Sequence, residues 1–107
     1  MREIKAFIHR NRIADVLHTL KHSGLCDDNC NISVVDVKGT LAAIDNSERN
    51  YSLQLGGAII TEIKLELMIA DDKSDAIVKI IREQARTGQA SAGWIFVNEI
   101  REAYKIE

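Results

Sequence analysis

The sequence contains no proline and only two cysteines among its 107 residues. Without proline, the breaks between helices and strands must depend on the six glycines and on polar residues. Two cysteines are too few for the disulfide framework that stabilises many small secreted domains. The 14 Lys and Arg residues do not outnumber the 16 Asp and Glu residues, which gives a net charge of -2. A nucleic-acid partner is therefore not expected, since binding the phosphate backbone requires a clustered surplus of cations.

Long hydrophobic runs are also missing, and no stretch reaches the roughly 18 apolar residues of a membrane-spanning helix. The first ten residues, MREIKAFIHR, alternate charged and apolar side chains and do not resemble a secretory signal peptide. We expect a cytoplasmic protein with no direct membrane insertion. The apolar fraction of 46% is typical of a folded chain, and the length predicts one domain over residues 1–107.

Enzyme signatures are absent as well. The sequence offers no Ser-His-Asp set in a suitable context, no cysteine beside a plausible base, and no Gly-Lys-Ser/Thr of a Walker loop. We predict that the protein is not an enzyme.

The hydrophobic periodicity predicts four strands and two helices. Ile4, Ala6 and Ile8 alternate with polar residues, as in a strand, whereas a spacing of three and four residues from Ile13 to Leu20 is typical of a helix. Asn11, Asp71 and Asp72 are candidate helix N-caps, and Gly24 is a candidate helix stop. The predicted elements are strands at about 2–9, 32–38, 59–69 and 94–100, and helices at about 12–23 and from Asp72 to Thr87-Gly88.

This order, βαββαβ, predicts an α+β ferredoxin-like fold, in which two helices cover one face of a four-stranded antiparallel sheet. The other face is left bare, and copies of the same chain are the simplest way to cover it. Residues 40–58 show no clear period and are predicted to form a long mobile loop, a kind of segment that is often functional.

Two glycine-containing segments are candidate phosphate-binding loops. Residues 36–40 follow the second predicted strand, and residues 85–93 follow the second predicted helix. Glycine lets backbone N–H groups approach a phosphate closely, and Lys38, Arg86 and Lys105 would balance its charge. From spacing alone, ordinary turns are the favoured interpretation of both segments.

The same residues carry a resemblance to a known family. Five segments carry it: residues 1–6, 34–39 and 63–67, the Asp71-Asp72 pair, and the run from Thr87-Gly88 through Gly93 into Ile-Phe-Val. These segments are similar to the PII signal-transduction family, and the similarity covers essentially the whole chain. The resemblance implies a homotrimer with three clefts between subunits, each able to hold an adenine nucleotide. It also implies that the loop at 40–58 reports the ligand state to a protein partner.

The resemblance further implies which residues form the nucleotide site. Gly39 matches the glycine that opens the cleft, Ser33 supplies a hydroxyl near the adenine, and Glu66 with the backbone of Met68 matches the strand that reads the purine edge. The full set of expected nucleotide-binding residues is Ser33, Lys38, Gly39, Thr40, Glu66, Met68, Arg86, Gly88, Gln89, Ala92, Gly93, Trp94 and Lys105.

The chain departs from the family at the triphosphate end of the cleft. Ala92 replaces an aspartate, while Trp94 and Glu62 stand where the family has lysines, and the tail offers Lys105 and Glu107 in place of two arginines. Charge-assisted contacts contribute about 1.5–3 kcal/mol each, so these losses should weaken ATP binding more than AMP or ADP binding. Trp94 is expected to pack in the core, or alternatively to stack on the nucleotide.

Three further segments are Gly39-Thr40 followed by Ala-Ala-Ile-Asp, residues 85–89, and Ala92-Gly93-Trp94. They are most similar to a divergent PII-like branch, some members of which are associated with carboxysomes and sense bicarbonate together with adenine nucleotides. For this branch the resemblance implies bicarbonate near the base of the loop, with Lys38 or Arg86 as its cation, and a membrane transporter as one class of partner.

The segment containing Cys26 and Cys30 suggests alternatives to nucleotide sensing. With His22, the two thiols could bind a metal ion, or the pair could form a reversible disulfide, or the segment could be a plain loop. A trimeric metal-handling or redox-sensing protein is therefore one alternative function, and a scaffold whose cleft has decayed is another. His9 has no ligand set around it and is expected at the surface.

Overall fold

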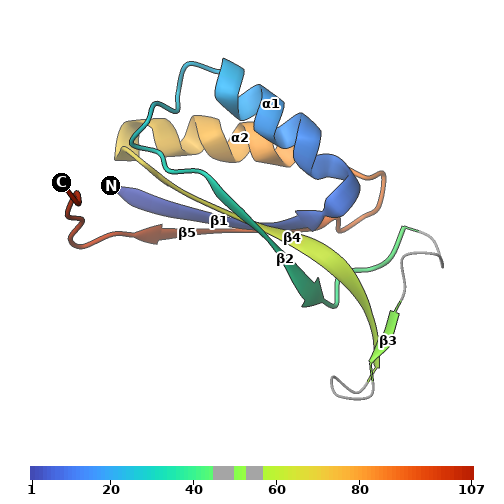
Figure 1. Ribbon diagram of the computed structural model, residues 1–107. Helices are drawn as coiled ribbons and strands as arrows, with labels where there is room; N and C mark the ends of the chain where they lie inside the picture. Colours follow the sequence, from blue (N-terminus) through green and yellow to red (C-terminus); the bar gives the residue numbers. More distant parts are fainter. Residues whose placement is uncertain (45–49, 53–56) are drawn as a thin grey trace.

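The structure is a computed structural model that describes residues 1–44, 50–52 and 57–107, with residues 50–52 as backbone alone. The predicted βαββαβ order is confirmed, and both helices lie on one face of the sheet (Figure 1). The sheet order is β2-β4-β1-β5, and every neighbouring pair is antiparallel. The elements are β1 Arg2–His9, α1 Ile13–His22, β2 Ser33–Gly39, β3 Asn50–Ser52, β4 Gly57–Ile69, α2 Ser74–Gln84 and β5 Gly93–Glu99.

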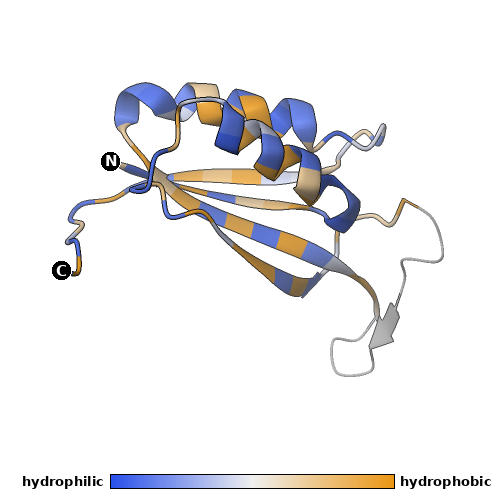
Figure 2. Cartoon of the chain, turned by 45° about the horizontal axis from the view of Figure 1, so that its top comes forward, coloured by the Kyte–Doolittle hydropathy of each residue, from blue (hydrophilic) through white to orange (hydrophobic). Residues whose placement is uncertain are grey.

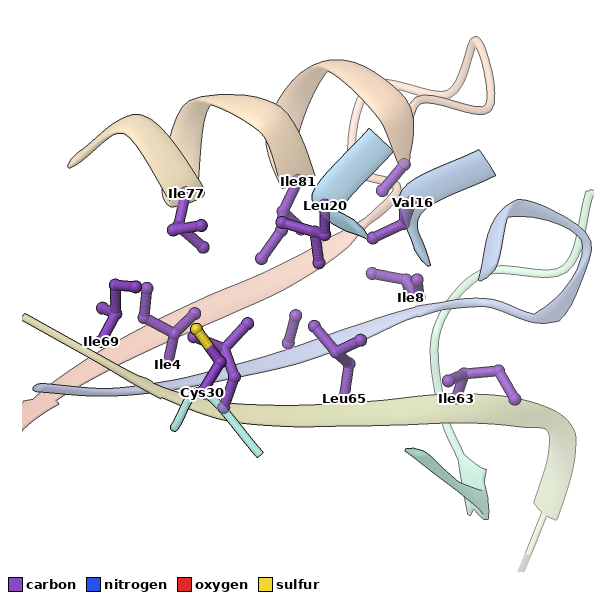
Figure 3. Close-up of a cluster of buried hydrophobic side chains, with 13 residues drawn as sticks. Ile4, Ile8, Val16, Leu20, Cys30, Ile63, Leu65, Ile69, Ile77 and Ile81 are labelled. Atoms are coloured by element: carbon purple, nitrogen blue, oxygen red, sulfur yellow. The ribbon is translucent and has the colours of Figure 1, made fainter. Parts of the chain in front are cut away.

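The core lies between the helices and the sheet (Figure 3). The alternation in β1 and β4 directs every second side chain toward the helices. The helical period of α1 and α2 places their apolar side chains on the face that packs against the sheet. Burying each large aliphatic side chain contributes about 1.5–3 kcal/mol. The fully buried residues include Ile4, Ala6, Ile8, Val16, Leu20, Leu65, Ile77 and Ile81.

The predicted helix caps are wrong. Both helices are entered through a single 3-10 turn, Arg10–Arg12 before α1 and Asp71–Lys73 before α2. These turns place Arg12 and Lys73 at the N-cap positions, and neither makes a side-chain capping bond. Asn11, Asp71 and Asp72 lie inside the turns instead. The predicted stop at Gly24 agrees with the structure, because α1 ends at His22 and Gly24 adopts a left-handed φ of 75°.

Part of the predicted loop at 40–58 forms strands in the residues that the structure describes. Asn50–Ser52 form the short strand β3, which pairs with Gly57–Ile59 at the start of β4. β4 therefore begins two residues earlier than the periodicity indicated. The rest of this prediction falls on residues 45–49 and 53–56, outside the described residues.

The face of the sheet turned away from the helices, here called the open face, is mixed rather than purely apolar. Figure 2 shows the alternation of hydrophilic and hydrophobic residues along β4. Phe7 and Phe96 meet edge to face on the open side with ring centroids 6.0 Å apart, while Lys64 and Glu66 form an ion pair at 3.2 Å. Trp94 was expected in the core, but it is 63% exposed in the protomer because its neighbour Ile95 takes the core-facing position.

The expectation for His9 is also wrong. His9 is the last residue of β1 and is fully buried. The pairing of β1 with β5 ends at Ile8, so His9 is paired with β4 alone. In the antiparallel register His9 lies opposite Glu62, which is buried as well.

Candidate nucleotide site

A cavity of about 490 Å³ lies where α2 ends and β5 begins. This volume is within the range of small-molecule pockets, about 300–1,000 Å³. Ile8, Ile81 and Ala85 form its apolar floor, and Arg82 and Arg86 bring positive charge from α2 and the residues after it. Six of the residues expected from the sequence line this cavity: Arg86, Gly88, Gln89, Ala92, Gly93 and Trp94.

Two glycines shape the loop around this cavity. Gly88 has a φ of 87° in the turn that follows α2. Gly93 has a φ of 156°, and a Cβ at this position would overlap the carbonyl oxygen of Phe7 on the neighbouring strand. The two positions therefore need glycine for different reasons: Gly88 for its backbone conformation alone, and Gly93 also for the close approach of β1.

Gln89 connects the cavity to the segment after β2. Its Nε2 donates hydrogen bonds to the carbonyl oxygens of Ala42 at 3.0 Å and Ala43 at 3.3 Å. Its Oε1 accepts a hydrogen bond from the Thr87 hydroxyl at 2.7 Å, which fixes the orientation of the amide. The wall of the cavity and the beginning of the 40–58 segment are thus joined by one side chain.

We expect the substitution Gln89→Glu to release this connection. A carboxylate cannot donate to the Ala42 and Ala43 carbonyls, and its charge would repel them. Losing about 1–1.5 kcal/mol of hydrogen bonding should speed amide hydrogen exchange in residues 41–44 by roughly tenfold. The matched control is Gln84→Glu, because Gln84 bonds Arg12 through its backbone oxygen. Equal exchange rates in the two variants would contradict the proposed link.

The base of the 40–58 segment is held by a carboxylate. Glu62 is 4% exposed, and its Oε2 accepts a hydrogen bond from the backbone N–H of Leu41 at 2.8 Å. The carboxylate occupies the space above Gly39, so a Cβ at Gly39 would overlap it. Sequence reasoning noted Glu62 only as a departure from the family and missed this contact. The signal was present in the alternation of β4, which places Glu62 on the same face as Lys64 and Glu66.

The remaining expected residues do not join the cavity within one protomer. Ser33 lies opposite Glu66 in the β2–β4 register, and Gly39 lies at the other end of β2. A strand rises about 3.3 Å per residue, so Ser33 and Gly39 are roughly 20 Å apart. Lys38 and Thr40 flank Gly39 and are exposed, Lys105 is exposed in the tail, and the Met68 N–H donates to the Cys30 carbonyl oxygen at 2.9 Å.

The structure does not assemble the alternative metal site. His22 bonds the His18 carbonyl oxygen through Nδ1 at 2.8 Å, and the two imidazole rings lie 4.2 Å apart. Over the described residues, no group of three or more His, Cys, Asp or Glu side chains is placed to hold a metal ion. Cys26 and Cys30 flank a short turn, and their thiols are considered below.

Comparison with known proteins identifies the family. The sequence model of the family "Nitrogen regulatory protein P-II" matches residues 1–107. The chain belongs to the P-II family. A P-II protein of Porphyra purpurea is 29% identical over 106 residues, which cover 99% of this chain and 91% of that protein. P-II proteins of Rhizobium meliloti strain 1021 and Methanothermobacter thermautotrophicus are 27% and 28% identical, with 91% and 89% of their lengths covered.

The family result confirms the resemblance to the PII family that was drawn from the sequence. P-II proteins are regulatory signalling proteins that generally form trimers, bind small effectors such as adenine nucleotides and contact partner proteins. No helix among the described residues of this P-II chain is long and apolar enough to cross a membrane.

Proposed function

We propose that this P-II protein is a cytoplasmic homotrimer that binds AMP or ADP in preference to ATP in its inter-subunit clefts. Bicarbonate is the proposed second ligand, with Lys38 or Arg86 as its cation. The bound state is transmitted to a protein partner through the 40–58 segment, and a membrane transporter is one class of partner. The observation that carries the proposal is the pair of hydrogen bonds from Gln89, which link the cavity wall to the base of that segment.

The separation of the expected residues supports a site shared between subunits. Ser33 and Glu66 do not line the cavity and lie at the opposite end of β2 from Gly39, so the expected residues do not surround one nucleotide within a protomer. A second copy that brings its Ser33 end against the cavity of the first would complete the set. The exposed Phe96 and Trp94 on the open face supply apolar surface for such an interface.

The preference for AMP or ADP rests on charge. Arg82 and Arg86 are the cations among the described residues lining the cavity, and the Glu62 carboxylate lies at the base of the neighbouring segment. Two cations can balance one or two phosphate groups, whereas a third phosphate would add negative charge near a carboxylate.

Isothermal titration calorimetry on the purified protein tests this proposal with AMP, ADP and ATP. We expect AMP or ADP to bind at least roughly tenfold more tightly than ATP, which corresponds to the loss of about 1.5 kcal/mol at the third phosphate. Bicarbonate should increase the thermal stabilisation that AMP or ADP produces. ATP binding much tighter than AMP and ADP would overturn the preference, and no response to any nucleotide would favour a scaffold with a decayed cleft.

Two single charge deletions test whether Arg86 contacts the nucleotide, with Lys79 as the control position. Arg86→Ala should weaken ADP binding by roughly 10- to 100-fold, because a charge-assisted contact contributes about 1.5–3 kcal/mol. Lys79→Ala removes the same charge from an exposed position on α2 that does not line the cavity. It should leave ADP affinity unchanged. Similar losses in both variants would mean that only long-range charge, and no specific contact, attracts the nucleotide.

A further inference from the structure

The segment between α1 and β2 holds the only two cysteines of the chain. The Asn29 N–H bonds the Asp27 carboxylate at 2.8 Å, and the Cys30 N–H bonds the Asp27 carbonyl oxygen at 3.2 Å. These bonds fold residues 27–30 back on themselves. Cys26 packs against the core cluster to which Cys30 belongs, and the Cys30 thiol lies close enough to raise the pKa of the Cys26 thiol.

The two thiols differ in their surroundings. Cys30 is 3% exposed and belongs to the core cluster, where Figure 3 shows its sulfur near Ile4. Its carbonyl oxygen accepts the Met68 N–H, which fixes the residue to the end of β4. Cys26 is only partly buried. A reagent from solution therefore reaches Cys26 first, and the anchored Cys30 is in place to respond.

We propose that Cys26 and Cys30 are a redox site that closes reversibly to an intramolecular disulfide. The oxidant is a low-molecular-weight disulfide of the glutathione type. The Cys26 thiolate attacks one sulfur of this disulfide, a mixed disulfide forms, and the first small thiol leaves. Cys30 then attacks the Cys26 sulfur and displaces the second small thiol. Two electrons and two protons pass from the protein to the small disulfide, and an excess of a small dithiol reverses both steps.

The resting pair is expected to react slowly at neutral pH. Burial raises the pKa of Cys26 to about 12, with further increases from the Cys30 thiol and the Asp27 charge and a partial offset by Lys73. Only the thiolate attacks, so the rate should rise by roughly tenfold per pH unit while Cys26 remains mostly protonated. The site would thus respond to sustained oxidising conditions and stay reduced otherwise.

The test uses the full chain, incubated with oxidised glutathione at pH 7, 8 and 9. We expect loss of both free thiols, a mass decrease of two hydrogen atoms, a Cys26–Cys30 link in peptide mapping, and recovery of both thiols with dithiothreitol. Cys30→Ser should stop at the mixed disulfide on Cys26. Because Cys30 is buried, Cys26→Ser serves as a second variant, and its remaining thiol should react far more slowly than Cys26 in the unchanged chain.

Other outcomes would overturn the proposal. These are two thiols that persist after incubation at pH 9, a stable mixed disulfide in the unchanged chain, or disulfides between chains. The readout is thiol chemistry and involves no nucleotide, so it succeeds or fails independently of the proposed function.

Discussion

Replacing Gly93 with alanine is expected to lower the free energy of unfolding by about 3 kcal/mol, the largest effect of any glycine substitution considered for this chain. Two costs combine at this position. The φ of 156° is strained for a residue with a side chain, and the new Cβ would overlap the Phe7 carbonyl oxygen. Neither group can move freely, because Phe7 lies in the central strand β1 and pairs on both sides.

Substitutions at two other glycines separate the cost of backbone strain from the cost of the Cβ overlap. Gly57→Ala is the matched control, because Gly57 begins β4 without a positive φ and nothing lies near its Cβ position. Its effect should be close to zero. Gly88 has a φ of 87° in open space, so Gly88→Ala should cost about 1–2 kcal/mol from backbone strain alone.

Urea unfolding at one fixed protein concentration measures all three, because the apparent stability of an oligomer depends on concentration. If Gly93→Ala costs no more than Gly88→Ala, the Phe7 backbone yields and the cavity wall is less rigid than its geometry indicates. If Gly57→Ala is also strongly destabilising, the series does not isolate the contact.

The substitution Gly39→Ala is expected to cost about 2 kcal/mol, but only while Glu62 is present. The new Cβ would displace the buried carboxylate and break its bond from the Leu41 N–H, a hydrogen bond to a charged group that contributes about 1.5–3 kcal/mol. In the Glu62→Ala background the space is empty, so the second substitution should add little. The coupling energy of the cycle should therefore be roughly 1.5–2 kcal/mol.

A second carboxylate on the same strand provides the control. Glu66 pairs with Lys64 at 3.2 Å on the partly exposed open face, and removing such a pair costs about 0–1 kcal/mol. Glu66→Ala combined with Gly39→Ala should be additive. A vanishing coupling between Gly39 and Glu62 would show that the carboxylate leaves its place at no cost, and that it does not hold the base of the 40–58 segment.

This contact bears on the proposed signalling route. The Glu62 carboxylate and the Gln89 amide hold successive residues, Leu41 and then Ala42 and Ala43. A nucleotide that moves either side chain would therefore change the constraint on the start of the segment, which is the physical form of a ligand-dependent switch. The Gln89→Glu and Glu62→Ala variants test the two halves of this route separately.

Several errors of the sequence interpretation have a common cause. Periodicity records which side of an element is apolar but not what covers the other side. Trp94 was expected in the core as the only tryptophan of the chain, whereas its strand position directs it to the open face. His9 was expected at the surface because no ligand set surrounds it in the sequence, whereas it is fully buried at the end of β1. The caps failed because a 3-10 turn moved both helix starts past the candidate residues.

The sequence by itself determined the order of the helices and of the four long strands, and the faces of the sheet, but not the short strand β3. The order and the faces depend on local alternation and helical period, which can be read along the chain, whereas the family came from the resemblance of whole segments. Only the tertiary structure decided that Gln89 reaches Ala42 and Ala43, that Glu62 lies over Gly39, and that Cys26 packs against the core cluster containing Cys30 instead of forming a metal group with His22. The first two contacts join residues more than 20 positions apart through strand register and loop packing, and the third depends on the path of a short turn. Such contacts depend on distances in space that the order of residues does not specify.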